Sequence, residues 1–402
     1  MNNQSSTNNF KTKTTFLKRN NIKPGNSWVI GLDIGYSSVK AFSPNSVMRF
    51  PSYATRVKEN FGFAGSAPWN SILYRNYETN EYWLAGEVAQ NIMSDTDTSD
   101  SEASLYGRER YSTAIFKVLS DVGLGLSYLT EENLSSICKK TDNNEFVLSP
   151  TIDEPIIIQT GLPEKYMDDE DDLIDSLTGN HKFGLKIGQS DWITFNISIN
   201  RENVYIMSQP KGTLFSICTK NDGNYVDNAL DYLHSSIIIF DAGFGTLDIF
   251  PIKAGTVKEG ETYSDLGMKR VLQETSAELK KKYKTNVPVP SMQKHLDSGT
   301  VTIFDKKTLS STNEDFSDIL FNKSKSICDE AIERLMSVLN LAEYSYIIVT
   351  GGTGAAWYNQ IVEKFKNAGT LTILKGNEND TLPFVFANAR GYYLYRTIKT
   401  KA

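Results

Sequence analysis

Three apolar segments that each end in glycines constrain the fold most. Residues 28–33 read WVIGLD and precede IGYSS, residues 237–241 read IIIFD and precede AGFGT, and residues 346–350 read YIIVT and precede GGTG. Runs of Ile and Val with little polar alternation are typical of strands buried on both faces. Glycine-rich turns just beyond the ends of such strands are where α/β proteins bind ligands.

Amphipathic patterns with helical spacing accompany these apolar segments. Apolar side chains recur every three to four positions in residues 103–120, 265–282 and 324–339, which is the spacing of one helix face. The second pattern closes with three lysines, which suit the negative end of a helix dipole. Because strands that alternate with amphipathic helices are typical of the α/β class, we predict an α/β fold.

The composition of the 402-residue chain narrows the functional classes. Hydrophobic residues make up 40% and charged residues 22%, which is ordinary for a globular chain long enough to form two domains. The net charge of −6 argues against broad electrostatic binding of nucleic acid. No apolar run approaches the roughly 18 residues that a membrane span needs. We therefore expect a cytoplasmic protein that binds neither nucleic acid nor membrane directly.

Several polar or scattered features predict no site of their own. Three cysteines, Cys138, Cys218 and Cys328, are far apart, so they indicate ordinary thiols rather than a disulfide framework or a metal site. Residues 1–27 are polar, amide-rich and basic, and we expect them to form a mostly disordered arm. Residues 95–102 and 168–172 are acidic runs that we interpret as exposed loops.

Two of the glycine turns repeat one motif 208 residues apart. The first contains Asp33, Gly35, Ser37 and Ser38, and the second contains Asp241, Gly243, Gly245 and Thr246. Glycine allows a tight hairpin whose backbone N–H groups can approach an anion. Ser or Thr adds a hydroxyl donor, and Asp offers an oxygen ligand for Mg²⁺ or its waters. Two such hairpins that face each other would hold the β- and γ-phosphates of a nucleotide from both sides.

Three further features are compatible with the same site. Lys40 follows Asp33 by seven residues and could bring positive charge to the phosphates. The turn at residues 350–354 precedes a predicted helix, and it fits either a nucleotide site or a tight turn that needs glycine for geometry alone. Asp248 could repeat a function of the second motif, but a structural carboxylate is the simpler interpretation.

The order of these motifs resembles the nucleotide-binding motifs of a known superfamily. DIGYSSVK at 33–40, DAGFGTLDIF at 241–250 and VTGGTGAAW at 349–357 are similar to the phosphate-1, phosphate-2 and adenosine motifs of actins, sugar kinases and heat-shock chaperone ATPases. GLP at 161–163, Gln209-Pro210 and NARGY at 388–392 resemble segments of bacterial actin-like ATPases of the ParM (plasmid segregation) type and of archaeal actin-like proteins. The resemblance covers roughly residues 28–398, and it implies an actin-like ATPase fold of two related domains with a nucleotide cleft between them.

The resemblance assigns a role to each residue at a matching position. Asp33 would hold Mg²⁺ through water, and Asp241 would orient Mg²⁺ or the attacking water. Gln209, where actins have Gln and ParM-type proteins often have Glu, would position the attacking water. The residues that would contact the phosphates or border the nucleoside are Gly35, Tyr36, Ser37, Ser38, Lys40, Gly243, Phe244, Gly245, Thr246, Gly267, Gly351, Gly352 and Thr353.

The same resemblance implies a domain order and a task. Domain I would comprise residues 28–210 and 380–402, and residues 211–379 would comprise an interdomain helix near 211–234 and domain II. The chain would bind ATP (with GTP as an open alternative) and Mg²⁺, and would polymerise into dynamic filaments that disassemble after hydrolysis. Such filaments would segregate plasmid DNA through a DNA-binding adaptor of the ParR type, so the expected partners are other copies of the chain and that adaptor.

Other functions of the same superfamily stay open. A small-molecule kinase would need a carboxylate base aimed at a substrate hydroxyl, and the sequence offers no dedicated candidate. A chaperone-type ATPase would carry a peptide-binding domain after the ATPase unit, and a membrane-tethered homologue would carry a terminal amphipathic helix. We expect neither of these last two, because the chain stops soon after Gly391 and both termini are polar.

Overall fold

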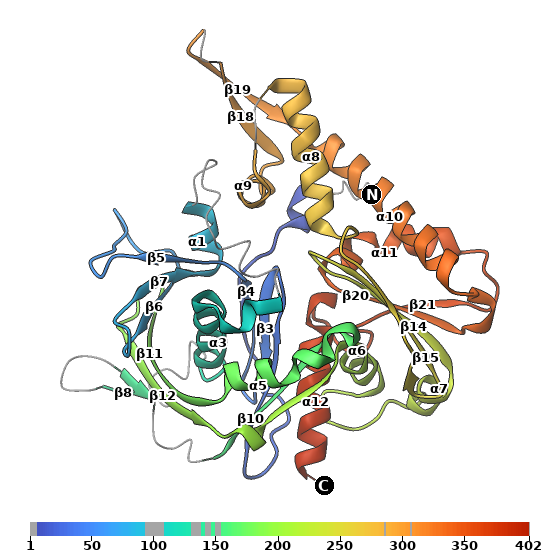
Figure 1. The fold of residues 1–402 in the computed structure, drawn as a ribbon, viewed down its shortest axis with the longest axis horizontal. Coiled ribbons are helices and arrows are strands. Elements are labelled where there is room, and N and C mark those ends of the chain that lie inside the picture. The colour runs from blue at the N-terminus through green and yellow to red at the C-terminus, as the bar shows by residue number, and fades with distance from the viewer. Residues whose placement is uncertain are drawn as a thin grey trace.

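Two lobes, each built on a mixed β-sheet, form the molecule (Figure 1). The computed structural model describes residues 6–92, 108–129, 138–140, 146–148, 154–284, 287–305 and 308–401. The acidic run predicted as a loop at 95–102 lies outside these residues. Mixed sheets covered by helices confirm the predicted α/β class.

The first lobe is centred on a six-stranded sheet whose middle strand carries the first glycine turn. In spatial order its strands are β1 (Thr15–Lys18), β4 (Ser46–Pro51), β3 (Ser38–Phe42), β2 (Trp28–Ile34), β10 (Ile156–Leu162) and β13 (Val204–Ser208). Strand β2 is buried along its whole length, as its unbroken apolar sequence predicts. Its two faces pack on different helices: Ile30 and Leu32 belong to the cluster around α3 (Ala114–Leu126), and Val29 to the cluster around α12 (Ala387–Lys401).

A second sheet of the first lobe lies beyond α3. Its strands in spatial order are β5 (Ala54–Val57), β7 (Tyr82–Ala85), β6 (Ile72–Asn76), β11 (Gly179–Ile187), β12 (Ile193–Ile199), β9 (Phe146–Leu148) and β8 (Cys138–Lys140). Short helical segments that surround these sheets are α1 (Gly86–Ile92), η2 (Arg108–Ser112), η3 (Glu164–Asp169), α5 (Glu170–Leu177) and η4 (Arg201–Asn203). Helix α3 begins later than the pattern at 103–120 predicts, because the Thr113 hydroxyl caps it by accepting from the Phe116 N–H.

The second lobe repeats this plan around the second and third glycine turns. Its sheet runs β16 (Thr256–Val257), β15 (Leu247–Lys253), β14 (Ser236–Ala242), β20 (Tyr346–Thr350) and β21 (Thr372–Lys375), with β17 (Glu261–Tyr263) also paired to β15. One face packs on α8 (Met268–Tyr283), α10 (Ser317–Val338) and α11 (Gly352–Phe365), and the other on α6 (Gln209–Cys218) and α7 (Ala229–His234). The remaining elements are α9 (Val289–His295), β18 (Thr300–Asp305), β19 (Ser310–Asp315), η5 (Leu341–Glu343) and η6 (Phe384–Phe386).

Two predictions about the elements are wrong in part. The helix expected near 211–234 is two helices, because the turn-forming sequence KNDGN at 220–224, with Gly223 at φ +85°, separates α6 from α7. The arm expected to be mostly disordered is packed over residues 6–27. Its 3-10 helix η1 (Thr7–Phe10) begins with Ser6 as a cap, and β1 pairs with β4 at the edge of the first sheet. The composition of the arm does not predict this packing, because backbone pairing and specific polar contacts hold the arm in place rather than apolar surface of its own.

Helices α6 and α12 cross in direct backbone contact, which joins the lobes below the cleft. A Cβ atom added to Gly391 would lie 1.8 Å from the carbonyl oxygen of Gly212, and one added to Gly212 would lie 2.5 Å from the ring of Tyr392. Beside the crossing, the buried guanidinium of Arg390 donates to the carbonyl oxygens of Ser216 and Thr219 and to Asp380. The glycines of the QPKG and NARGY segments are therefore required by close helix packing.

We predict that Gly391→Ala destabilises the protein by at least about 2 kcal/mol, because the added methyl group forces the two helices apart. Gly65→Ala is the matched control, since a Cβ at Gly65 would meet no atom within 4 Å. Chemical denaturation measures both free energies of unfolding. Equal values for the two variants would contradict the packing constraint.

Candidate functional site

The two Asp-x-Gly motifs form hairpins of the same geometry. In β2–β3, Asp33 pairs with Lys40 across the strands, and the Gly35 N–H donates to the Ser38 carbonyl oxygen at 3.1 Å. In β14–β15, Asp241 pairs with Asp248, and the Gly243 N–H donates to the Thr246 carbonyl oxygen at 2.8 Å. The repeat seen in the sequence is therefore a structural repeat, one copy in each lobe.

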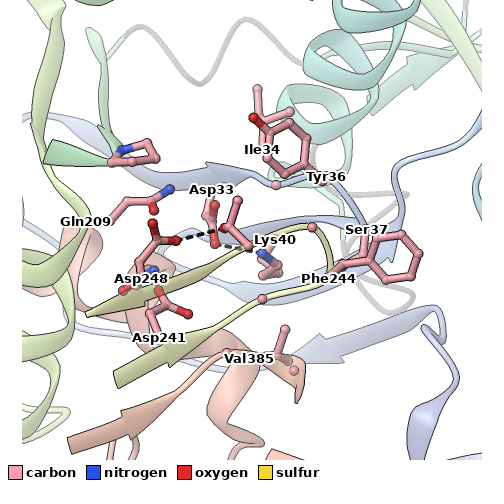
Figure 2. Close-up of a pocket in the computed structure, with 18 of the residues that line it drawn as sticks. Asp33, Ile34, Tyr36, Ser37, Lys40, Gln209, Asp241, Phe244, Asp248 and Val385 are labelled. Atoms are coloured by element: carbon pink, nitrogen blue, oxygen red, sulfur yellow. Dashed lines mark hydrogen bonds and ion pairs between the residues drawn. The ribbon is translucent and has the colours of Figure 1, made fainter. Parts of the chain in front are cut away.

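A cavity between the lobes contains most of the residues that the sequence singled out (Figure 2). Its predicted members are Asp33, Gly35, Tyr36, Ser37, Lys40, Gln209, Asp241, Gly243, Phe244, Gly245, Thr246, Gly351 and Gly352. Figure 2 shows Asp33 and Lys40 on one hairpin, Asp241 and Asp248 on the other, and the Gln209 side chain directed into the same space. The turns that were 208 residues apart in the sequence thus face one another.

A second hollow continues from this cavity behind the hairpin turns. The two share Ser37, Phe244, Gly352 and Val385 as lining residues. The second hollow is bordered by α10 and α11, by the N-terminal arm, and by Ser38 and Thr353. A ligand with a polar chain at one end and a flat ring system at the other could therefore lie across both hollows, with the turns around its middle.

Three predicted contact residues lie outside the first cavity and support its turns. Ser38 is fully buried, and the Thr353 hydroxyl donates to the Gly243 carbonyl oxygen at 2.6 Å. Gly267 lines neither hollow. It lies behind the second turn, where a Cβ atom would come within 2.6 Å of the Phe244 carbonyl oxygen. The expected direct contact of Gly267 with a ligand is thus replaced in the structure by close packing against the loop.

Gly351 explains why the third turn needs glycine. Its φ is +82°, and a Cβ atom there would lie 2.2 Å from the Ala242 carbonyl oxygen and 2.6 Å from Asp241 Oδ1. Backbone geometry and crowding against the second hairpin therefore both exclude a side chain. The geometric reason for glycine is therefore present, and Gly351 and Gly352 also line the cavity, where a ligand could approach the turn.

Several cavity residues were not predicted from the sequence. Asn388 from α12 donates to Asp241 Oδ2 at 3.1 Å, and its own Oδ1 accepts from Thr213. Asp169 is buried and lines the cavity, so the acidic run at 168–172 is not simply an exposed loop: it forms the end of η3 and the start of α5. The other unpredicted lining residues are Ile34, Arg110, Tyr111, Pro163, Tyr166, Asp248, Thr350 and Val385. Five of these residues lie within motifs quoted from the sequence, although no contact was assigned to them there: Ile34, Pro163, Asp248, Thr350 and Asn388. The others lie in the 3-10 helices η2, η3 and η6, where the sequence carries no distinctive motif.

The charges of the cavity are unevenly divided between the hairpins. Lys40 Nζ lies 2.7 Å from Asp33 Oδ2, and both side chains are buried. Burial and then the neighbouring Asp248 raise the pKa of Asp241 to about 7, against the Asn388 hydrogen bond. Burial also raises the pKa of Asp248 to about 6, against hydrogen bonds from Thr262 and Thr246. The second hairpin thus presents two carboxylates that a nearby cation would favour in their ionised form.

These groups match what a magnesium–phosphate ligand requires. Mg²⁺ keeps several waters and takes few carboxylates besides substrate phosphates, which fits the separate positions of Asp33 and Asp241. In the described part of the chain, no group of three or more His, Cys, Asp or Glu side chains is placed to hold a metal directly. Backbone N–H groups of the two turns, the Ser37 hydroxyl and Lys40 are the available partners for phosphate oxygens, whereas the Thr246 hydroxyl donates to Asp248.

The helices of the described residues include none with the length and the apolar sequence that a membrane span requires.

Comparisons with known proteins agree with the observed fold. Residues 31–212 match the family model of the N-terminal domain of actin-like proteins. The chain is similar to the ParM of a 15-stranded filament from Clostridium botulinum (TM-score 0.65, 19% identity, covering 92% of this chain and 99% of that one). It is also similar to the actin-like protein Alp7A (0.63, 15%, covering 92% and 96%) and to the archaeal actin homologue Ta0583 in complex with ADP (0.59, 16%, covering 92% and 99%). No curated protein sequence matches the chain.

We predict that the Asp241 carboxylate makes the nucleotide-free protein less stable as the pH rises. Its pKa is about 7 in the folded protein and about 3.8 unfolded, so folding favours the protonated form. The associated stability is complete below pH 4 and is lost as the pH rises towards 7. The free energy of unfolding of Asp241→Asn relative to the wild type should therefore increase between pH 5 and 8, by on the order of 1–3 kcal/mol. Chemical denaturation without Mg²⁺ measures this difference. Asp227→Asn, at a fully exposed carboxylate, should show no such trend. An advantage of Asp241→Asn that does not change with pH would contradict the assignment.

Proposed function

We propose that this chain, which has the actin-like fold and matches the actin-like N-terminal domain model over residues 31–212, binds and hydrolyses a nucleoside triphosphate between its lobes. The observation that carries the proposal is the pair of matching hairpins that face each other across the cavity. Each supplies backbone N–H groups and a hydroxyl at its turn, so a phosphate chain between them contacts both lobes at once. ATP is the first choice of nucleotide, with GTP as the alternative.

Mg²⁺ accompanies the nucleotide in this proposal. Asp33 and Asp241, on the two hairpins, would hold its waters, and the bound ion would supply charge neutralisation and polarisation at the terminal phosphate. Lys40, already paired with Asp33, adds positive charge on the first hairpin. The raised pKa values of Asp241 and Asp248, which come first from burial, are consistent with this, because a bound cation would favour the ionised form of both carboxyl groups.

Gln209 positions the water that attacks the γ-phosphate. It is the first residue of α6, directly after β13, and its side chain lies in the cavity with Asp241 and Asp248 (Figure 2). A neutral amide is a weak base, but phosphoryl transfer depends mainly on alignment and charge neutralisation. The Asn388 amide donates to Asp241, and this hydrogen bond would help to hold the Asp241 carboxylate in its position in the cavity.

Nucleotide-dependent polymerisation is the second part of the proposal. A ligand held by both lobes favours the closed arrangement, and the polymer would form from that arrangement. The similar ParM from Clostridium botulinum has been solved as a filament, which supports self-association of this chain as well. We further propose that the filaments move plasmid DNA in the cytoplasm through a DNA-binding adaptor of the ParR type, since the net charge of −6 does not favour direct contact with DNA.

We predict that Gln209→Ala lowers ATP turnover about 100-fold while nucleotide affinity stays within about threefold, because water alignment is lost and phosphate contacts remain. The ATP-bound polymers should consequently last longer. The matched control is Gln189→Ala, at an exposed turn between β11 and β12. Phosphate release and sedimentation, measured on the same samples, give both readouts.

Two outcomes would count against the proposal. Wild-type turnover in the Gln209→Ala variant would remove Gln209 from the mechanism. No sedimentable polymer with any nucleotide or salt condition would overturn polymerisation, and ATP consumption that requires an added sugar or acid would instead favour the small-molecule kinase.

A further inference from the structure

The N-terminal arm crosses the mouth of the cleft from one lobe to the other. The Thr7 hydroxyl donates to the Leu296 carbonyl oxygen at 2.7 Å, beside α9 of the second lobe. Eight residues later the arm has joined the first lobe, where β1 pairs with β4. Phe10 of the arm contacts Phe321 of α10, and the blue trace of the arm in Figure 1 runs towards β4. The arm therefore spans the side of the cleft that lies opposite the α6–α12 crossing.

One buried lysine holds the arm to both lobes. The Lys11 side chain is 3% exposed, and its Nζ lies 3.2 Å from Glu87 Oε1 of α1 in the first lobe. The same Nζ pairs with Asp297, which follows α9 in the second lobe. Two arm N–H groups add to this attachment: that of Thr14 donates to Glu87 Oε2 at 2.9 Å, and that of Thr12 to Gln293 Oε1 at 3.3 Å. Because Lys11 is buried between carboxylates of different lobes, separating the lobes would break a charge pair.

The arm also forms one wall of the second hollow. Residues 8–13 line it, opposite side chains of α10 and α11. The Phe10 ring lies 5.9 Å from the ring of Phe321 on α10, which brings an aromatic pair to this hollow. Asn8 also lines this hollow, and its Oδ1 is buried without a hydrogen-bond partner among the described residues. An unsatisfied acceptor beside aromatic rings is what the amino group of a nucleobase requires.

We propose that the arm is the closing wall of the nucleoside half of the site, so that the nucleotide leaves only when the arm undocks. The Asn8 carboxamide accepts from the exocyclic amino group of the base, and Lys11 holds the wall in place through Glu87 and Asp297. This inference rests on nucleotide binding in the cleft. Nucleotide binding and arm docking share one surface. The bound nucleotide therefore stabilises the docked arm by the same free energy by which the docked arm stabilises the bound nucleotide.

The test measures the release of a fluorescent ATP analogue, chased with ATP, from the full chain and three variants. Asn8→Ala should release it about tenfold faster, because the acceptor of the base's amino group is lost. Lys11→Gln should do the same, because the ion pairs that hold the arm to both lobes are lost. Lys23→Gln is the matched control, since Lys23 belongs to the same arm but pairs with Glu154 at the surface. Its release rate should stay within about twofold of the wild type, and circular dichroism verifies that all variants are folded.

Limited trypsin digestion measures whether bound nucleotide protects the arm from cleavage. An arm that only stabilises the fold would show no such protection. Saturating nucleotide should slow cleavage after Lys11 and Lys13 severalfold in the wild type, and much less in Asn8→Ala. If the nucleotide binds but release rates and cleavage are unchanged, this inference is wrong while the proposed function stands. Slower release from Lys11→Gln would show that the arm competes with the ligand and would equally overturn the inference. A wild type that binds no nucleotide would overturn both.

Discussion

The contact between Gly212 and Gly391 is the constraint on which the arrangement of the two lobes depends. Helix α12 packs on β2 of the first lobe, and α6 packs on β14 of the second, so their crossing joins the two sheets. From α12, Asn388 reaches Asp241 in the second hairpin. A substitution that shifts α12 at the crossing would therefore also displace Asn388 and alter its hydrogen bond to Asp241. The cleft is closed at this end by backbone packing and at the other by the polar contacts of Lys11.

The two hairpins are alike in backbone and different in charge. At equivalent pairing positions, the first hairpin has Lys40 opposite Asp33, and the second has Asp248 opposite Asp241. The first hairpin is thus internally neutralised, while the second carries two carboxyl groups with raised pKa values. If the hairpins hold phosphates as we propose, this asymmetry would give a cation a preferred side. It also gives Asp248, interpreted from the sequence as structural, a place in the electrostatics of the site.

The sequence predicts best those features that local chemistry determines. Buried strands such as β2 and β14 and their glycine turns are visible because burial on both faces needs unbroken apolar runs. The α6–α7 break was missed because a turn sequence inside a helical pattern decides it, and the arm because specific contacts such as Lys11–Glu87 outweigh its polar composition. Tertiary packing alone brings Arg110 and Asp169 to the cavity, and no periodicity or motif in the sequence predicts this position.

The central claim is that one nucleotide touches both hairpins. Its most direct test is an experimental structure of the chain with Mg²⁺ and a non-hydrolysable ATP analogue. The account predicts that the phosphates lie between the turns at Gly35 and Gly243, with Gln209 facing the terminal phosphate and the base in the hollow beside the arm. Phosphates bound to one lobe alone, or a nucleotide bound outside the cleft, would contradict it.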